Sequence, residues 1–201
     1  MPNDRAPRRE AEPQRLFVAV PIPDRIADVV EAATRPWRAV LPQARWVERS
    51  DWHVTLHFLG STHPRSVPQV RERLAEVSAV TLPFLTRVRN LGAFPSTRRA
   101  GVLWAGLVDA ERRFAALASA IQRSVAGELA SEGRVFTAHL TVARSDPPLT
   151  LPEGYAETSL ESEVFTVGAF VLMRSHVRRP SQRYEPLETY PLGSGVEFTP
   201  G

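Results

Sequence analysis

The chain has 201 residues, with 25 lysines and arginines against 22 aspartates and glutamates, and it contains no cysteine. It is long enough to bury a hydrophobic core, either as one domain or as two closely joined lobes. The lack of cysteine excludes disulfides and thiolate metal sites. The formal charge of +3 excludes a broadly polycationic protein, so any affinity for nucleic acid must come from locally placed arginines.

The sequence contains neither a membrane-spanning pattern nor a secretory signal. No apolar run approaches the roughly 20 residues that cross a bilayer. Arg5, Arg8 and Arg9 are not followed by the apolar segment that a secretory signal requires. We therefore expect a cytoplasmic protein, and we expect it to be a monomer.

Strand-like and helix-like patterns alternate along the chain. In chain order we expect a flexible arm over 1–14, a strand over 15–20, a helix over 25–39, strands over 45–47 and 52–59, a helix over 67–79, a strand over 84–88, a loop over 91–99, a strand over 101–107, a helix over 110–130, a strand over 136–143, a loop over 145–148, strands over 165–173 and 182–190 joined by a turn at 178–181, and a flexible tail over 192–201. Asp24 and Asp109 are the expected N-caps of the first and third helices. This order predicts an α+β fold with largely antiparallel sheets.

One strand carries the most informative pattern, His53-Val54-Thr55-Leu56, which returns as His139-Leu140-Thr141-Val142. Side chains alternate between the two faces of a strand, so each histidine shares a face with the threonine roughly 7 Å further on. On the first strand we expect His57 on this face too, and Leu56 and Phe58 in the core behind it. A single pattern of this kind is usually structural. Two copies, one in each half, predict two similar lobes that present histidine and threonine to a shared cleft.

The doubled motif and its flanks resemble the two-histidine (2H) phosphoesterase superfamily, and within it the bacterial RNA 2′,3′-cyclic phosphodiesterases, or 2′-5′ RNA ligase-like proteins. The resemblance covers about residues 14–192. Besides the motifs, it rests on the segments 15–19, 91–95, 102–106 and 183–187. Ala138 stands where the family often has proline. The resemblance implies one bilobal domain over 15–191 with pseudo-twofold symmetry, two largely antiparallel sheets, flanking helices and a central cleft.

Histidine can donate or accept a proton near neutral pH, so two imidazoles beside one phosphorus atom can divide the acid and base work. The residues alone do not say which histidine does which. The resemblance implies that His139 is the general base for the attacking water and His53 the general acid for the departing 3′ oxygen, which leaves a 2′-phosphomonoester. Thr55 and Thr141 are then hydrogen-bond donors to the non-bridging oxygens, where charge builds up.

We expect no metal or cofactor, because the motifs lack the additional histidine or carboxylate of a zinc or two-metal site. The expected partner is RNA or a nucleotide with a 2′,3′-cyclic phosphate. Arg144 can contact its phosphate from the end of the second motif strand, or can simply be solvated. Phe94 can stack on a base, or can tuck into its own lobe. Three tryptophans are expected in the core: Trp46, Trp52 and Trp104.

Two other functions remain open on the sequence. Ligation of RNA through a 2′-5′ linkage is the same displacement with a 5′-hydroxyl in place of water, and it needs the same four motif residues. A non-catalytic module could instead keep the cleft to bind nucleotides or RNA. The intact state of both motifs makes this third interpretation the least favoured.

Overall fold

The computed structural model describes residues 12–125, 136–177 and 182–193. Its elements in chain order are β1 (Gln14–Pro21), α1 (Asp24–Val40), β2 (Arg45–Trp46), the 3₁₀ turn η1 (Arg49–Asp51), β3 (His53–Thr62), the 3₁₀ turn η2 (Pro64–Ser66), α2 (Val67–Val80), β4 (Phe84–Thr86), β5 (Val88–Ser96), β6 (Arg99–Leu107), α3 (Arg113–Val125), β7 (His139–Leu149), β8 (Phe165–Val167), β9 (Ala169–Val177) and β10 (Gln182–Pro191). Most of the expected arm and tail, the turn over 178–181 and the end of the third expected helix lie outside the described residues.

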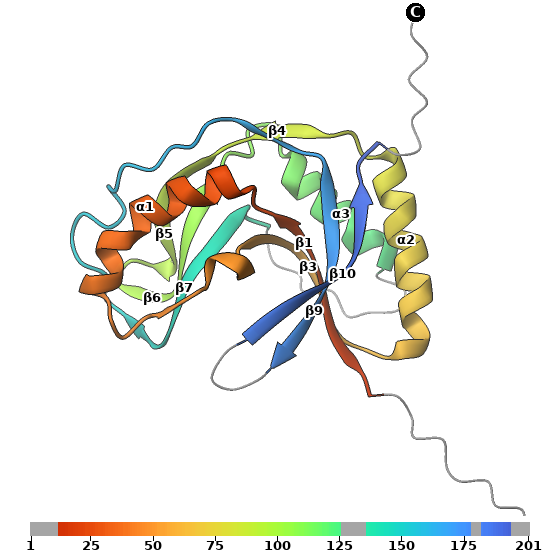
Figure 1. Ribbon diagram of the computed structural model, residues 1–201, viewed down its shortest axis with the longest axis horizontal. Coiled ribbons are helices and arrows are strands. Elements are labelled where there is room, and N and C mark those ends of the chain that lie inside the picture. Colours follow the sequence, from red (N-terminus) through yellow and green to blue (C-terminus); the bar gives the residue numbers. More distant parts are fainter. Residues whose placement is uncertain (1–11, 126–135, 178–181, 194–201) are drawn as a thin grey trace, which may run out of the picture.

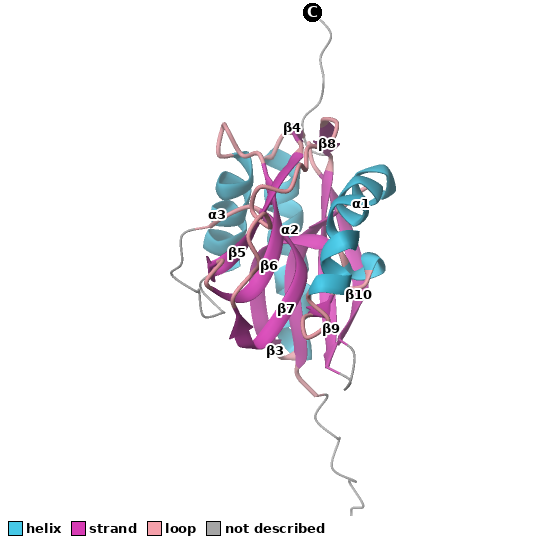
Figure 2. Cartoon of the chain, turned by 90° about the vertical axis from the view of Figure 1, so that its left-hand side faces the viewer, coloured by secondary structure: helices cyan, strands magenta, loops and turns pink. Residues whose placement is uncertain are grey.

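The described strands form two antiparallel sheets, which confirms the predicted α+β class. The larger sheet has eight strands in the order β10-β9-β1-β3-β7-β6-β5, with β2 paired to β7, and the smaller one joins β4 to β8. Figure 1 and Figure 2 show α1 on one side of the large sheet and α3 on the other. The two halves of the chain meet inside the large sheet, because β3 pairs with β7 and the equivalent strands β1 and β6 flank this pair.

The helices bury the apolar stripes that the sequence predicts. Ile26 and Val30 of α1 are fully buried, and so are Phe114 and Ile121 of α3. Full burial of an aliphatic or aromatic side chain stabilises a fold by about 1.5–3 kcal/mol relative to exposure. These stripes hold both helices against the sheet and so support the strands between them.

Neither expected N-cap residue occupies the N-cap position. The helix α3 begins at Arg113, four residues after Asp109, although the Asp109 side chain still caps its first turn. The Asp109 carboxylate accepts hydrogen bonds from the backbone N–H groups of Phe114, at 2.9 Å, and Ala115, at 3.2 Å. In α1 the N-cap is Pro23, and Asp24 is the first helical residue. The prediction for Asp24 is therefore wrong by one position, although a carboxylate in the first turn still favours the helix through its dipole.

Both stretches expected as loops belong largely to strands. The segment 91–99 lies mainly in a hairpin of β5 and β6, and 145–148 lies within β7. The glycine in the first segment, Gly92, favours a loop when only the sequence is considered, but in the fold it makes room for a neighbouring side chain. A Cβ on Gly92 would lie only 2.3 Å from the indole of Trp104 on the paired strand, so only glycine leaves room for that ring.

Two strands expected as continuous are each divided. The stretch 84–88 contributes β4 and the start of β5, and 165–173 contributes β8 and part of β9. The breaks fall at Arg87 and Gly168, where the chain passes from the small sheet to the large one. Pairing between β4 and β8 is a long-range contact, which local sequence patterns cannot reveal.

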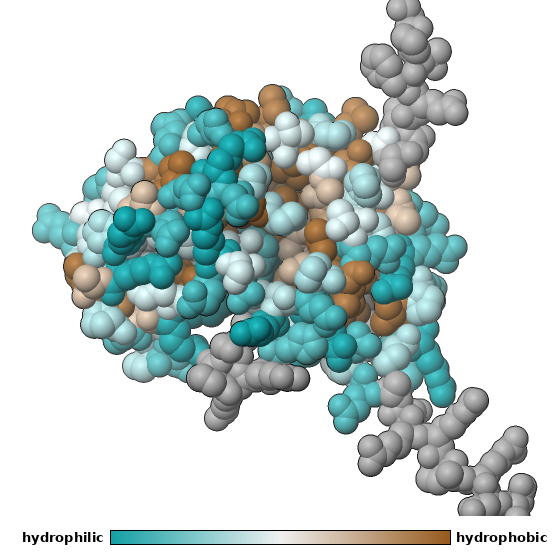
Figure 3. Space-filling view, in the orientation of Figure 1, coloured by the Kyte–Doolittle hydropathy of each residue, from teal (hydrophilic) through white to brown (hydrophobic). Residues whose placement is uncertain are grey.

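The surface has a mixed character. Figure 3 shows hydrophilic residues over most of the visible face, with hydrophobic residues between them. Among the described residues, the large hydrophobic ones with exposed side chains are Val40, Phe58, Val80, Leu82, Leu85 and Val164. Within the described residues, no helix combines the length and apolar character needed to cross a membrane.

Candidate active site

The two motifs bring four predicted site residues together: His53, Thr55, His139 and Thr141. The strands β3 and β7 run antiparallel, and Val54 pairs with Leu140. These two partners are fully buried, whereas the four motif side chains are partly exposed, so the motif side chains share the opposite face of the sheet. The register places each histidine opposite the threonine of the other motif. Diagonal neighbours of this kind lie roughly 7–8 Å apart, which lets the two histidines contact one phosphoryl group.

Each imidazole is oriented by a backbone carbonyl two residues earlier. His53 Nδ1 lies 2.7 Å from the carbonyl oxygen of Asp51, and His139 Nδ1 lies 2.7 Å from that of Thr137. A carbonyl oxygen can only accept a hydrogen bond, so Nδ1 carries the hydrogen in both rings. The remaining nitrogen, Nε2, is therefore the one that can take up or deliver a proton in each motif.

Burial lowers the pKa of both histidines. It lowers the pKa of His53 to about 4, and the charges of Arg144 and His139 add to this effect while the Asp51 carbonyl opposes it. The pKa of His139 is also lowered, by burial first and by Arg144, against the Thr137 carbonyl. Both rings are therefore neutral in the free protein at neutral pH.

Both motif strands carry a β-bulge at the same place. The pairing of β1 with β3 skips Leu56, and the pairing of β6 with β7 skips Val142. Each skipped residue directly follows the threonine of its motif. An extra residue reverses which face the following side chains occupy. The residue five positions after each histidine therefore returns to the face of that histidine.

In the second motif the bulge brings Arg144 to the site. Arg144 is exposed, and its charge lowers the pKa of His53, His139 and Tyr184. Strict alternation along β7 would have placed this side chain on the buried face. The geometry is thus consistent with the predicted phosphate contact.

In the first motif the bulge brings Phe58, not His57, to the face of His53. Phe58 pairs with Phe17, and their ring centroids lie 6.0 Å apart. Phe58 is 52% exposed, so the prediction that it anchors the core is wrong. His57 pairs with Val18 in the ladder, so its expected place on the face of His53 is wrong for the same reason.

Aromatic rings border both histidines. The centroid of His53 lies 5.0 Å from that of Phe17 and 4.9 Å from that of Tyr184, which meets it edge-on. His139 meets Phe94 edge-on at 5.0 Å. Phe94 therefore lies beside the candidate site, which is the position it needs if it is to stack on a base of the substrate. Phe17 and Tyr184 belong to segments that carry the family resemblance, but the sequence assigned these two rings no role.

The three tryptophans do not all lie in the core. Trp52 is buried as expected, whereas Trp46 and Trp104 are partly exposed. Trp104 packs against Phe94 at a centroid distance of 5.3 Å and therefore extends the aromatic surface beside His139. Its position depends on Gly92, whose lack of a side chain admits the indole.

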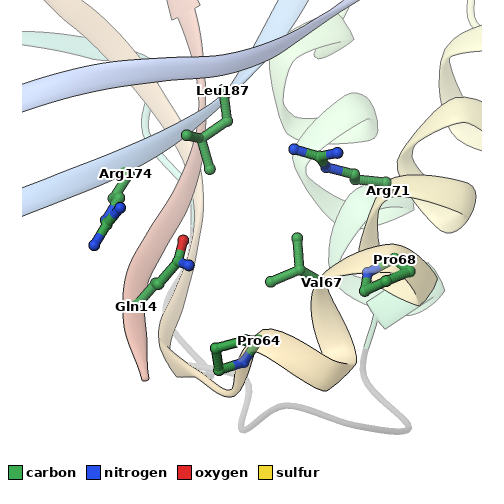
Figure 4. A pocket seen from close by; sticks show the side chains of 7 residues that line it. All are labelled: Gln14, Pro64, Val67, Pro68, Arg71, Arg174 and Leu187. Carbon is green, nitrogen blue, oxygen red and sulfur yellow. The ribbon is translucent and has the colours of Figure 1, made fainter. Parts of the chain in front are cut away.

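A separate hollow of about 560 Å³ lies between α2 and the strands β1, β9 and β10, and its lining includes Val67, Arg71, Arg174 and Leu187 (Figure 4). Arg71 is paired with Glu188 at 3.1 Å. None of the predicted site residues lines this hollow. In the part of the chain that the structure describes, no three histidine, cysteine or acidic side chains gather as they would around a metal ion.

The chain is similar to proteins of known activity. A family model described as the 2′-5′ RNA ligase superfamily matches residues 22–179. The RNA 2′,3′-cyclic phosphodiesterase of Geobacillus stearothermophilus is 28% identical over 88% of the chain, and that of Thermus thermophilus is 31% identical over 89% of it. The match covers 56% of the Geobacillus protein and 90% of the Thermus protein, so the chain spans about half the length of the first relative.

Solved structures share the fold. A crystal structure of a Thermus thermophilus protein superposes with a TM-score of 0.74 at 27% identity, covering 89% of this chain and 98% of that one. Escherichia coli LigT complexed with 3′-AMP superposes with a TM-score of 0.69 at 25% identity, covering 90% and 99%. Together with the doubled motif on adjacent strands, these similarities show that the chain belongs to the 2′-5′ RNA ligase superfamily.

Proposed function

We propose that the protein hydrolyses RNA 2′,3′-cyclic phosphodiester ends to 2′-phosphomonoesters, with His53 and His139 as general acid and base. The observation that carries the proposal is the pairing of the two motif strands, which presents two Nε2 atoms and two threonine hydroxyls on one face. The proposal is supported by relatives named RNA 2′,3′-cyclic phosphodiesterase and by the LigT complex with 3′-AMP.

The proposed step is an in-line displacement at phosphorus. His139 Nε2 accepts a proton from water as the water oxygen bonds to phosphorus. The bond from phosphorus to the 3′ oxygen breaks, and His53 Nε2 delivers its proton to that oxygen. The product carries a 2′-phosphate and a 3′-hydroxyl, and exchange with solvent restores both imidazoles. The chemistry needs only these two proton transfers, and we propose that it proceeds without a metal.

Thr55, Thr141 and Arg144 would stabilise the charge that develops on the non-bridging oxygens. Each threonine lies opposite the histidine of the other motif, so the hydroxyls flank the same phosphorus position as the imidazoles. Donors that are already in place before the reaction stabilise a developing oxyanion more than they stabilise the substrate. The guanidinium of Arg144 adds a full positive charge at the same face.

The acid must be protonated when the substrate is bound, although burial lowers the pKa of His53 to about 4 in the free protein. A bound phosphodiester places a negative charge beside both rings and raises the pKa of each. Substrate binding and protonation are thus coupled. The roles that we assign to the two histidines follow the family resemblance. Because burial lowers the pKa of His53 so strongly, its role as the acid should be tested directly.

These roles also place the nucleoside. The 3′ oxygen receives its proton from His53, so the ribose lies on the His53 side of the phosphorus, and water attacks from the His139 side. The exposed ring on the ribose side is Phe58. We therefore propose Phe58 as the platform for the base of the cyclic end. Phe94, which contacts His139, would instead border the attacking group.

The same arrangement supports 2′-5′ ligation as a second candidate. A 5′-hydroxyl that replaces water would bring its own nucleoside to the His139 side. The rings of Phe94 and Trp104 there, 5.3 Å apart, could receive its base.

The test is product analysis of an oligonucleotide with a 2′,3′-cyclic phosphate in the presence of EDTA, using the wild type, His53→Ala and His139→Ala. We expect a 2′-phosphomonoester from the wild type, and a loss of roughly 10²–10⁴ in rate for each variant. A substrate with sulfur in place of the 3′ oxygen separates the roles, because a thiolate leaves without a proton. Its cleavage should persist in His53→Ala and fail in His139→Ala. Wild-type rates in both variants would contradict the proposal.

A further inference from the structure

Arg15 lies on the same face of the large sheet as the candidate site. Its strand, β1, runs through both of its ladders without an extra residue, because the bulges in its pairing with β3 lie in β3. Side chains two positions apart in such a strand share a face and lie roughly 7 Å apart. Phe17 contacts the imidazole of His53 at a centroid distance of 5.0 Å, so its face is that of the site. The side chain of Arg15 therefore starts from this face, roughly 7 Å beyond Phe17.

The neighbouring strands place Arg15 on this face independently. Arg15 pairs with Ser175 of β9, and Ser175 pairs with Tyr184 of β10. Residues that lie directly opposite each other in antiparallel strands share a face. The ring of Tyr184 meets that of His53 edge-on at 4.9 Å and lies 5.1 Å from that of Phe17. The transverse row that contains Arg15 therefore belongs to the face of the site.

The guanidinium of Arg15 is open to a ligand. Arg15 is exposed, and so is Ser61, its partner in β3. Its partner on the other side is also a serine, Ser175, and side chains this short cannot cover an arginine. Within the part of the chain that the structure describes, no acidic side chain forms an ion pair with Arg15. A full positive charge thus stands on the site face without a counter-charge from these residues.

Aromatic rings lie between the catalytic motif and Arg15. Along the site face of β3, His53 is followed by Phe58 and then by Ser61, which pair with Phe17 and Arg15 of β1. Phe58 is 52% exposed, and it is the ring assigned above to the terminal base. The face therefore offers a phosphate site, then a ring, then a cation. This order matches phosphate, nucleoside and phosphate along an RNA strand.

We propose that Arg15 binds the phosphate on the 5′ side of the terminal nucleoside, so that the preferred substrate is the end of an RNA strand and not a free cyclic mononucleotide. This inference rests on the proposed function and specifies its substrate class. A nucleoside 2′,3′-cyclic phosphate has no 5′-phosphate, so only a longer chain can make the contact. Guanidinium suits it, because its N–H groups form charge-assisted hydrogen bonds to phosphate oxygens. The contact lies one nucleotide away from the reacting phosphorus, so it should strengthen binding of substrate and transition state alike.

The kinetic experiment compares a cyclic mononucleotide with a cyclic-ended oligonucleotide, using the wild type, Arg15→Ala and the matched control Arg174→Ala. Arg174 pairs with Leu16, which is buried, so it stands on the opposite face of the sheet. We expect Arg15→Ala to raise KM for the oligonucleotide about tenfold with little change in kcat, the effect of losing one charge-assisted contact. KM for the mononucleotide should change by at most about twofold. Arg174→Ala should match the wild type on both substrates. Equal effects of Arg15→Ala on the two substrates, or an equal loss in Arg174→Ala, would overturn the inference.

A binding measurement separates this inference from the proposed function. In the His139→Ala background, fluorescence anisotropy gives the affinity for the cyclic-ended oligonucleotide at several salt concentrations. Adding Arg15→Ala should reduce the slope of log K against log salt by about 0.7, the value for one phosphate contact to a single strand. Arg15→Lys keeps the charge and should keep most of the slope. An unchanged slope in Arg15→Ala would overturn the inference. A wild type that opens neither substrate, with the change in slope present, would contradict the proposed function and leave the phosphate contact of Arg15 supported.

Discussion

Leu56 and Val142 are the extra residues of two equivalent β-bulges, each placed directly after the threonine of its motif. Without them, the side chains five positions after the histidines would point into the core. With them, Phe58 and Arg144 stand on the same face as His53 and His139. The two bulges are equivalent in the backbone, but the side chains that they bring to the site differ: Phe58 is a neutral ring and Arg144 is a cation. The site is therefore symmetric in its acid–base pair and asymmetric in its substrate contacts.

Removing the Arg144 charge should weaken catalysis and move its pH dependence. We expect Arg144→Ala to lower kcat/KM about 10–100-fold, the cost of roughly one charge-assisted contact to phosphate. Arg144 lowers the pKa of both histidines, so both values should rise in the variant and the kcat/KM profile should shift to higher pH. Arg65→Ala, an exposed arginine on η2, is the control. An unshifted profile would show that Arg144 does not act on the histidines.

Truncating Phe58 and Phe94 should have different effects. Phe58→Ala should raise KM for a cyclic nucleotide about tenfold, since stacking of a base on an aromatic ring contributes about 1–3 kcal/mol. Because Phe58 is 52% exposed, its loss should change the melting temperature little. Phe94→Ala should affect hydrolysis less and 2′-5′ joining more. Steady-state kinetics of hydrolysis and of 2′-5′ joining with both variants measures these effects. A larger effect of Phe94→Ala than of Phe58→Ala on hydrolysis would place the cyclic end on the His139 side.

Stability should fall as the pH decreases below about 6.5, partly because of His53. Its pKa is about 6.5 in the unfolded chain and is lowered to about 4 in the fold. The unfolded state therefore binds more protons between these values, and the stabilisation present above pH 6.5 is lost as the pH falls. The slope for one such group is at most about 1.4 kcal/mol per pH unit.

The variant His53→Gln isolates this effect, because every other titrating group stays the same. Urea unfolding at pH 7 and pH 5 should show a smaller loss of stability in the variant than in the wild type. Equal losses in the two proteins would mean that the imidazole is as accessible to protons in the fold as in the unfolded chain.

Adding one methyl group at Gly92 should damage both the fold and the site. A Cβ there would lie 2.3 Å from the Trp104 indole, so the ring or the strand must move. We expect Gly92→Ala to destabilise the protein by about 1–3 kcal/mol, as overpacking does. Thermal unfolding measures this cost. Gly168→Ala is a suitable control, because a Cβ there meets no atom within 4 Å. Equal melting temperatures for the two variants would contradict the packing that we describe.

Much of the secondary structure follows from local patterns. Apolar residues recur at helical spacing in α1 and α3. The pairs Ile26 and Val30 in α1 and Phe114 and Ile121 in α3 are fully buried, as that spacing predicts. Patterns failed where long-range contacts decided the outcome. Gly92 favours a loop by its residue type, but in the fold it lies in a strand opposite Trp104, where only glycine leaves room for the indole. The short strands β4 and β8 form because they pair with each other.

The order of residues was enough to reveal the chemistry that is available: two histidines, each with a threonine two residues later, and a doubled motif that indicates a family. Alternation along a strand is a local property, so it also placed each His–Thr pair on one face. The folded chain was needed to show that β3 and β7 are neighbours in one sheet, that bulges present Phe58 and Arg144, and that Tyr184 lies against His53. Register, bulges and contacts between distant elements depend on how whole strands pack together, and a short stretch of sequence does not encode that packing.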